Sequence, residues 1–179
     1  MKIMIASDIH GSAYYCKLML DAFSAEKADK LLLLGDILYH GPRNDLPRDY
    51  DPRSVISQLN AISDKIVCVR GNCDSEVDGM VLNFPISADS AMLILGDRTV
   101  FATHGHIYNE QNLPKLAKGD ILLHGHTHIP VAADRGSYIF LNPGSVSIPK
   151  ENSPHSCIIL SDNTFRWLDL ENMSSYMEF

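Results

Sequence analysis

The sequence predicts an α/β fold with two β-sheets and helices on the outside. In the first half, short apolar runs alternate with helix-like segments. That order predicts parallel strands joined by right-handed crossovers. In the second half, from residue 80 onward, short apolar runs follow one another with turn signals between them, as in a β-rich segment. The chain of 179 residues is long enough for one domain, and no linker divides 1–179.

The first half contains three predicted strands and two predicted helices. The strands are short apolar runs bounded by turn signals, at 3–7, 31–34 and 66–70. Residues 12–27 carry apolar side chains at helical spacing, and Ser12 is a suitable N-cap. A second helix is predicted over 53–63. The segment 39–52 has three prolines and no periodicity, so we expect a functional loop there.

The second half is expected to be mostly strands. They are predicted at 80–82, 92–95, 99–102, 121–123, 131–133, 138–141, 157–160 and 165–168. The pairs Gly96-Asp97, Arg135-Gly136 and Asp162-Asn163 are typical of hairpin turns. One helix is expected over 109–118. The tail, 171–179, is expected to fray or to pack on a partner subunit.

Composition narrows the class of protein. The formal charge of −7, without a cluster of Lys and Arg, argues against binding to long nucleic acids. No apolar stretch reaches the ~20 residues of a membrane span. Asp8 and His10 interrupt any signal-peptide pattern at the start, so we expect a cytoplasmic protein. The four cysteines are scattered and are expected to be free thiols.

Five of the predicted strands end in side chains that bind metals. The residues are Asp8 and His10, Asp36, Asn72, His104 and His106, and His126 and His128. Open sheets bind ligands outside the carboxyl ends of their strands, so neighbouring strands would bring these side chains together. Carboxylate and imidazole ligands together suit Mn, Fe, Zn or Co. The sequence therefore predicts a metal site with room for two ions, which the Asp36 carboxylate could bridge.

The blocks that carry these side chains resemble those of calcineurin-like metallophosphoesterases. They are Asp8-Ile9-His10-Gly11, Gly35-Asp36, Gly71-Asn72-Cys73-Asp74, His104-Gly105-His106 and Gly125-His126-Thr127-His128, in the family's order. The resemblance implies a four-layer α/β-β/α sandwich of two mixed sheets flanked by helices. It also implies a dinuclear site, with Mn as the expected metal and Fe, Zn, Co or Ni as alternatives.

The resemblance also implies which residues hold each ion. The first ion would be held by Asp8, His10, Asp36 and His128. The second would be held by Asp36, Asn72, His104 and His126. Such a centre implies hydrolysis of a small phosphodiester by a hydroxide that bridges the two ions, and nucleotide-derived diesters are among the candidate substrates.

Cys73 departs from the family pattern, because many members have a histidine at that position. A thiol is a poorer general acid than imidazole, so esters with good leaving groups would be preferred. Cys73 could instead be a weak metal ligand or a packing residue. His106 could replace the missing acid or support a ligand.

Other roles stay open at the level of sequence. Arg43 could donate charged hydrogen bonds to a phosphate oxygen, or it could be a surface arginine without a role in the site. The turn Asn142–Ser145 could support the site, and His155 is expected to be exposed. The alternative functions are a phosphomonoesterase or nucleotidase, and a scaffold such as the retromer subunit of this fold. The scaffold should have lost ligands, whereas here each ligand position is filled. Self-association into a dimer or tetramer is also expected to be possible.

Overall fold

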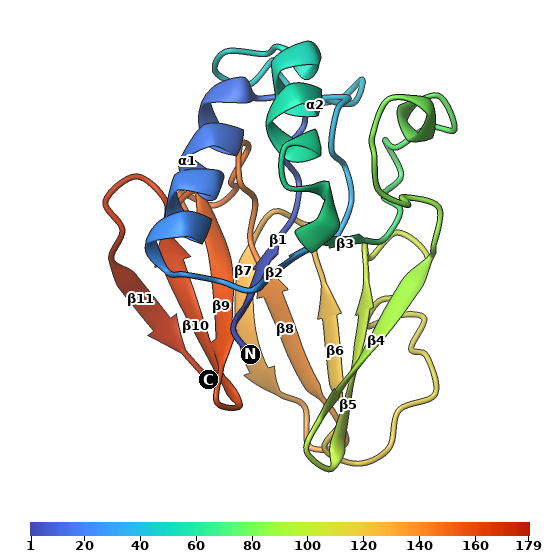
Figure 1. Ribbon diagram of the computed structural model, residues 1–179. Helices are drawn as coiled ribbons and strands as arrows, with labels where there is room; N and C mark the ends of the chain where they lie inside the picture. Colours follow the sequence, from blue (N-terminus) through green and yellow to red (C-terminus); the bar gives the residue numbers. More distant parts are fainter.

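The computed structural model describes residues 1–179 and contains two β-sheets that pack face to face (Figure 1). The first sheet has six strands in the order β11-β10-β9-β1-β2-β3. Their bounds are β1 (Ile3–Ala6), β2 (Lys30–Leu33), β3 (Ile66–Cys68), β9 (Ser156–Ser161), β10 (Thr164–Asp169) and β11 (Ser175–Glu178). β1, β2 and β3 are parallel, as predicted from the strand–helix–strand order, and β9 joins β1 in the antiparallel sense.

The second sheet has five strands in the order β4-β5-β6-β8-β7. Their bounds are β4 (Ser90–Leu95), β5 (Arg98–Thr103), β6 (Ile121–His124), β7 (Pro130–Asp134) and β8 (Ile139–Pro143). β5, β6 and β8 are parallel, and β4 and β7 pair with them as antiparallel edge strands. Each predicted hairpin turn is confirmed, because the three turn pairs connect β4 to β5, β7 to β8 and β9 to β10.

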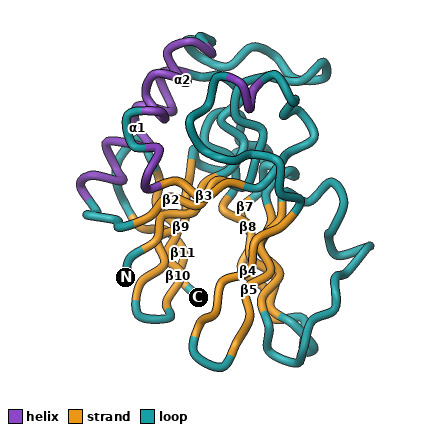
Figure 2. The backbone as a smooth tube through the Cα atoms, turned by 45° about the vertical axis from the view of Figure 1, so that its right-hand side comes forward, coloured by secondary structure: helices purple, strands orange, loops and turns teal.

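Two helices, α1 (Ala13–Ala25) and α2 (Pro52–Asn60), cover the outer face of the first sheet (Figure 2). The predicted cap of α1 is confirmed, since the Ser12 hydroxyl accepts the Tyr15 N–H at 3.2 Å. Asp51 caps α2 by accepting the N–H groups of Arg53 and Ser54. Short 3₁₀ turns follow at Ser63–Lys65 and Asp78–Met80.

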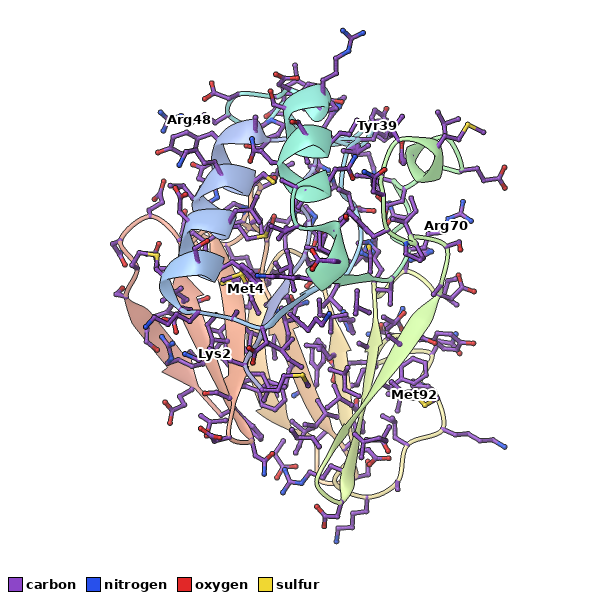
Figure 3. All side chains as sticks on the ribbon, in the orientation of Figure 1. Lys2, Met4, Tyr39, Arg48, Arg70 and Met92 are labelled. Carbon is purple, nitrogen blue, oxygen red and sulfur yellow. The ribbon has the colours of Figure 1, made fainter.

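The core has three parts because each sheet alternates its side chains between two faces. Met4 lies between the first sheet and the helices (Figure 3). Leu31 belongs to the same cluster, and both side chains pack with residues of α1 and α2. Ile5 and Leu32, one position further along, point the other way and form the core between the two sheets. A small third cluster around Phe101, Leu122 and Phe140 lies on the outer face of the second sheet. The predicted sandwich is thereby confirmed.

The predicted helix over 109–118 is wrong, and an irregular segment covers the second sheet instead. The Asn109 side chain accepts the N–H groups of Gln111 and Asn112 at 2.9 Å and so forms a local turn that competes with a helix. Pro114 then removes a further backbone donor from the middle of the segment. Tyr108 and Leu116 of this segment pack on the third cluster.

Three smaller expectations are corrected. The predicted strand at 80–82 is a turn, and the Met80 side chain is exposed. The tail does not fray, because β11 pairs with β10 and extends the first sheet. His155 is not solvent-exposed, since its ring stacks on Tyr15 with ring centres 3.7 Å apart.

All four cysteines are free, as predicted. No helix in the structure combines the length and the apolar character that crossing a membrane requires.

Candidate metal centre and its cleft

The five strand ends that were predicted to carry ligands meet at one end of the molecule. They come from two sheets rather than one. β1, β2 and β3 of the first sheet supply the loops with Asp8, His10, Asp36 and Asn72, and β5 and β6 of the second sheet supply His104, His126 and His128. These loops gather at the upper end of the molecule in Figure 1, where the two sheets come together.

Five of the seven predicted ligands have left-handed backbone conformations. Their φ angles are 60° at Asp8, 49° at His10, 57° at Asp36, 65° at His126 and 63° at His128. Such a conformation costs about 1–3 kcal/mol at a residue with a side chain, and it persists only where the surroundings hold it. Its concentration at one place indicates a functional site rather than ordinary turns.

Two serines hold the strained loop after β1. The hydroxyls of Ser145 and Ser147 donate to the Asp8 carbonyl oxygen at 2.9 and 3.1 Å. Both serines are buried, and they directly follow β8, whose last residues Asn142 and Pro143 are strand rather than the predicted turn. The segment Asn142–Ser145 was predicted as a candidate to support the site. The Ser145 hydroxyl is placed for that role, because it binds the backbone of Asp8.

The buried carboxylate of Asp74 ties the loops after β2 and β3 together. It accepts the N–H groups of Asp36 and Ile37 at 2.8 Å and that of Gly71 at 2.7 Å. Burial raises the pKa of Asp74, although these donors act in the opposite direction. Any side chain at Gly71 would collide with the Asp36 carboxylate, so the close approach of the two loops requires glycine.

Asp8, His10 and His128 form the first group of possible ligands. The Nε2 atoms of the two histidines lie 3.3 Å apart, and the His128 Nε2 lies 3.3 Å from the Asp8 Oδ1. The His10 Nδ1 donates to the Tyr39 carbonyl at 2.8 Å, and the His128 Nδ1 donates to the Ile148 carbonyl at 2.6 Å. In the neutral rings, both Nε2 atoms therefore present lone pairs.

His104 is the centre of the second group. Its Nδ1 donates to the Leu34 carbonyl at 2.7 Å, so its Nε2 presents a lone pair. That Nε2 lies 3.0 Å from the Asn72 Oδ1, 3.1 Å from the His126 Nδ1 and 3.4 Å from the Asp36 Oδ2. The same Asp36 oxygen lies 3.7 Å from the His10 Nε2, so it stands between the two groups.

The donor atoms fit metal ions. The two Nε2 atoms of the first group face each other as acceptors, and the buried Asp8 Oδ1 has no hydrogen-bond donor. Acceptor atoms that face one another have no hydrogen between them and cannot form a hydrogen bond. A bound cation would interact favourably with all of them at once. The backbone carbonyls on the remote ring nitrogens fix each ring, as is usual for histidine ligands.

The electrostatics of the two groups favour a bound cation as well. Burial would raise the pKa of Asp8, but contacts with His10 and His128 hold it well below its usual value. Burial would lower the pKa of His104, but Asp36 and Asp8 raise it to about 9. Burial and His104 lower the pKa of His126 to about 4. A metal ion would take the place of the proton on His104 and leave every histidine neutral.

An open cleft of about 430 Å³ lies over these groups. Beside the ligands, its wall consists of Gly41, Pro42, Arg43, Asn44, Cys73, Thr127 and Lys150. Arg43 belongs to the loop 39–52, and neither Arg43 nor Lys150 has a carboxylate partner. The cleft can therefore receive an anion. The loop 39–52 forms part of its wall, which agrees with the expectation of a functional loop there.

Cys73 and His106, which were predicted as catalytic candidates, lie in different places. The half-exposed Cys73 thiol lines the cleft, within 4.8 Å of ligand atoms of His10 and Asp36. Burial and the nearby Asp36 raise its pKa to about 12. His106 does not line the cleft. Its ring lies 5.3 Å from that of His104 and faces a separate cavity.

Sequence reasoning missed Lys150, Thr127 and the role of Asp74. Lys150 lies five positions beyond the segment Asn142–Ser145, and it belongs to none of the predicted ligand blocks that could have indicated a role. Thr127 and Asp74 lie inside the blocks that were singled out, between or beside the ligands, and adjacency was the available signal.

The chain is similar in sequence to known phosphoesterases. Residues 1–164 match the family model described as the calcineurin-like phosphoesterase superfamily domain. The phosphodiesterase YfcE of Escherichia coli K12 is 47% identical over 174 residues, which are 97% of this chain and 95% of YfcE. The probable metallophosphoesterase YsnB of Bacillus subtilis is 24% identical over 168 residues, covering 90% of this chain and 84% of YsnB.

Solved structures agree with the fold. That of YfcE, described as a phosphoesterase from E. coli, superposes with a TM-score of 0.96 at 46% identity and covers 100% of this chain and 98% of its own. Vps29 of Entamoeba histolytica, complexed with Zn²⁺, has the same fold with a TM-score of 0.65 at 19% identity, covering 100% and 98%. With its ligand-type residues gathered at one end of two packed sheets, this chain belongs to the calcineurin-like phosphoesterase superfamily.

Proposed function

We propose that this protein is a metal-dependent phosphodiesterase that acts on small phosphodiesters. The observation that carries the proposal is the complete set of facing donor atoms around Asp36, beneath a cleft with two unpaired cations. The likeness to YfcE, which is named as a phosphodiesterase and is 47% identical, supports the same activity.

We propose that the site holds two divalent ions. Asp8, His10, Asp36 and His128 would hold the first ion, and Asp36, Asn72, His104 and His126 the second. Two ions at such a centre supply a hydroxide near neutral pH and balance the charge that develops on the phosphate. The chain's own part is to fix the ligand rings through the carbonyls of Tyr39, Leu34 and Ile148.

The residues on the wall of the cleft orient the substrate. Arg43 and Lys150 lie where they can bind the non-bridging phosphate oxygens, and the guanidinium suits two oxygens at once. The Cys73 thiol faces the cleft but is a weak proton donor, so the departing group must leave largely without help. Aryl diesters should therefore react faster than alkyl diesters.

The test is hydrolysis of bis-p-nitrophenyl phosphate by chelator-stripped protein, with and without added Mn²⁺. We expect cleavage only with metal, and a loss of at least about 100-fold in the Asp36→Asn variant. Asp97→Asn, an exposed aspartate in the turn between β4 and β5, is the matched control. Metal-independent cleavage, or full activity of Asp36→Asn, would contradict the proposal.

The identity of the metal is part of the proposal, and we propose Mn²⁺. Oxygen and imidazole ligands without a thiolate cluster suit Mn²⁺ and also Fe, Zn, Co and Ni. Each metal is added separately to the stripped protein, and the bound amount is measured beside the rate. Two equivalents per chain with the highest rate for Mn²⁺ would support the proposal.

A phosphomonoesterase is the second candidate, because the same donor set can hold a phosphate with one ester group. The parallel assay with p-nitrophenyl phosphate separates the two activities, and we expect the diester to be strongly preferred. A non-catalytic scaffold is disfavoured, because all seven ligand positions are filled and geometrically assembled.

We further propose that residues 1–179 act as one catalytic domain in the cytoplasm, since both sheets supply ligands to one centre. Free thiols on all four cysteines fit a reducing compartment. Assembly into a dimer or tetramer stays a prediction, which light scattering can check.

A further inference from the structure

A second cavity lies directly beside the metal centre and shares only His126 with the ligand set. Its volume is about 430 Å³. His126 and Thr127 line both this cavity and the catalytic cleft, so they form the wall that the two spaces share. A group attached to a phosphate in the cleft could therefore extend past this wall into the cavity.

The lining of the cavity suits an uncharged organic group. Ile129, Val131 and Phe140 supply an apolar wall. At the rim, Arg135 binds Glu110 through two hydrogen bonds of 2.7 and 3.1 Å, so the two charges compensate each other. No unpaired carboxylate, lysine or arginine remains in the lining to attract an ionic group.

His124 lines the cavity and has a ring nitrogen without a hydrogen-bond partner. The residue is only 3% exposed, and its ring packs against Phe140 in a tilted arrangement with the ring centres 4.5 Å apart. The Nδ1 atom donates to the Gly125 carbonyl at 3.0 Å, so the Nε2 of the neutral ring carries a lone pair. That Nε2 is buried and has no partner in the protein, and the same is true of the Nδ1 of His106, which also lines the cavity.

Unsatisfied buried polar atoms are unusual and call for a bound partner. A phosphodiester has two ester groups, whereas the metal centre needs only the phosphate and a path for the departing group. The other ester group must lie somewhere beside the phosphate, and a monoester has no such group.

We propose that the cavity bounded by His124, Phe140 and Arg135 binds the ester group that stays on the phosphate, and that this group is uncharged, nucleoside-sized and carries hydrogen-bond donors. The inference rests on the proposed phosphodiesterase function. It predicts the expected preference for diesters over monoesters, because only a diester has a second ester group that fills the cavity. Pockets of a few hundred Å³ with an apolar wall and a few polar groups are typical of such sites.

The test compares two esters with the same leaving group. Thymidine 5′-(p-nitrophenyl) phosphate carries an uncharged nucleoside with N–H and O–H donors, and methyl p-nitrophenyl phosphate carries only a methyl group. For the Mn²⁺-loaded protein we expect kcat/KM to be about tenfold or more higher for the thymidine ester, mainly through a lower KM.

Two variants probe the cavity. Gln111→Trp places a bulky ring at the rim, where the exposed Gln111 side chain makes no hydrogen bond, and His124→Phe removes the acceptor while keeping a ring against Phe140. Each should reduce the preference for the thymidine ester about tenfold by raising its KM. Lys115→Trp, in the same irregular segment but outside the cavity, is the matched control and should keep the wild-type preference.

A binding measurement separates this inference from the proposed function. Saturation-transfer NMR detects thymidine on the chelator-stripped protein, and the signal should disappear in Gln111→Trp but not in Lys115→Trp. Equal kcat/KM for the two esters, or variants that impair both esters alike, overturns the inference. If neither ester is cleaved, the proposed function fails. In that case the thymidine signal alone tests whether the cavity binds a nucleoside. If the signal is absent, the inference is overturned as well.

Discussion

At the residue scale, the side chain at position 73 should determine which leaving groups the protein hydrolyses well. Its thiol lies in the cleft beside Asp36 and His10, where many relatives in the family are expected to carry an imidazole. The Cys73→His variant should therefore restore a general acid and raise turnover of diesters with alcohol leaving groups, such as a 2′,3′-cyclic nucleotide, by at least about tenfold. Rates on bis-p-nitrophenyl phosphate should change less, since that leaving group needs little protonation.

Cys73→Ser is the control for this variant, because it replaces the thiol by a hydroxyl of similar size and adds no imidazole. Metal content is measured in all three proteins, since an imidazole beside Asp36 and His10 could also bind an ion. Unchanged rates on the cyclic nucleotide, with metal content intact, would show that Cys73 does not occupy the place of the acid.

Arg43 is a second side chain whose role the structure sharpens. It lines the cleft without a carboxylate partner, although Asp45 and Asp49 lie in the same loop. We expect Arg43→Ala to raise KM for bis-p-nitrophenyl phosphate about tenfold with a smaller effect on kcat, because a bound phosphate loses two charged hydrogen bonds. Arg53→Ala, an exposed arginine on α2, should behave as wild type. Equal effects of the two variants would place Arg43 among ordinary surface arginines.

The elements are held together by a charged network at the end of α1. Glu26 follows the helix and pairs with Arg166 of β10 at 2.8 Å and with Lys2 before β1 at 3.4 Å. Burial would raise the pKa of Glu26, but the two cations hold it below the usual value of 4.5. The pair therefore stabilises the fold above that pH, and its contribution is lost as the pH falls through the lowered pKa.

Glu26→Gln should lower the free energy of unfolding by about 1 kcal/mol at pH 7 and by less at acidic pH. Urea unfolding at pH 7 and pH 4 measures both values. Asp21→Asn is the matched control, since Asp21 pairs only with the exposed Lys17 on the same helix. A loss that is the same at both pH values would mean that packing, rather than charge, is responsible.

The sequence predicted most elements because their signals were local. Ser12 capped a periodic helix, and Asp162-Asn163 stood between two apolar runs, so neither needed information from elsewhere in the chain. The failures have two different causes. At 109–118 the Asn109 side chain binds the backbone of its own neighbours and prevents a helix, a local competition that the apolar spacing does not reveal. At the tail a tertiary contact decides, because β11 is a strand only where β10 offers a free edge.

The same division applies to the candidate site. The ligand types could be read from the strand ends, because each lies within a few residues of an apolar run. Their left-handed backbone conformations could not be predicted, because they depend on contacts between distant parts of the chain. The hydroxyls of Ser145 and Ser147, which bind the Asp8 carbonyl, are 137 and 139 residues away from it in the sequence. Lys150 likewise enters the cleft only through the path of the chain after β8.

At the scale of the whole molecule, the proposed metal centre would connect the two sheets, because its proposed ligands come from both of them. Asp8, His10, Asp36 and Asn72 belong to loops of the first sheet, and His104, His126 and His128 to loops of the second. Bound ions would therefore join the carboxyl ends of the two sheets and relieve the close approach of Asp8 and Asp36. The two sheets also share a large apolar core, which should keep the stripped protein folded.

Metal removal should accordingly lower the melting temperature without unfolding the protein at 25 °C. An ion present at 100 times its dissociation constant stabilises the folded state by about 2.7 kcal/mol. For a chain of this size, that corresponds to a rise of about 5–10 °C. Calorimetry of the stripped protein with increasing Mn²⁺ measures the shift. His128→Ala, which removes a ligand of the second sheet, should abolish most of it, whereas Asp97→Asn should not. A melting temperature independent of Mn²⁺, in protein that binds two equivalents, would mean that the ions do not join the sheets.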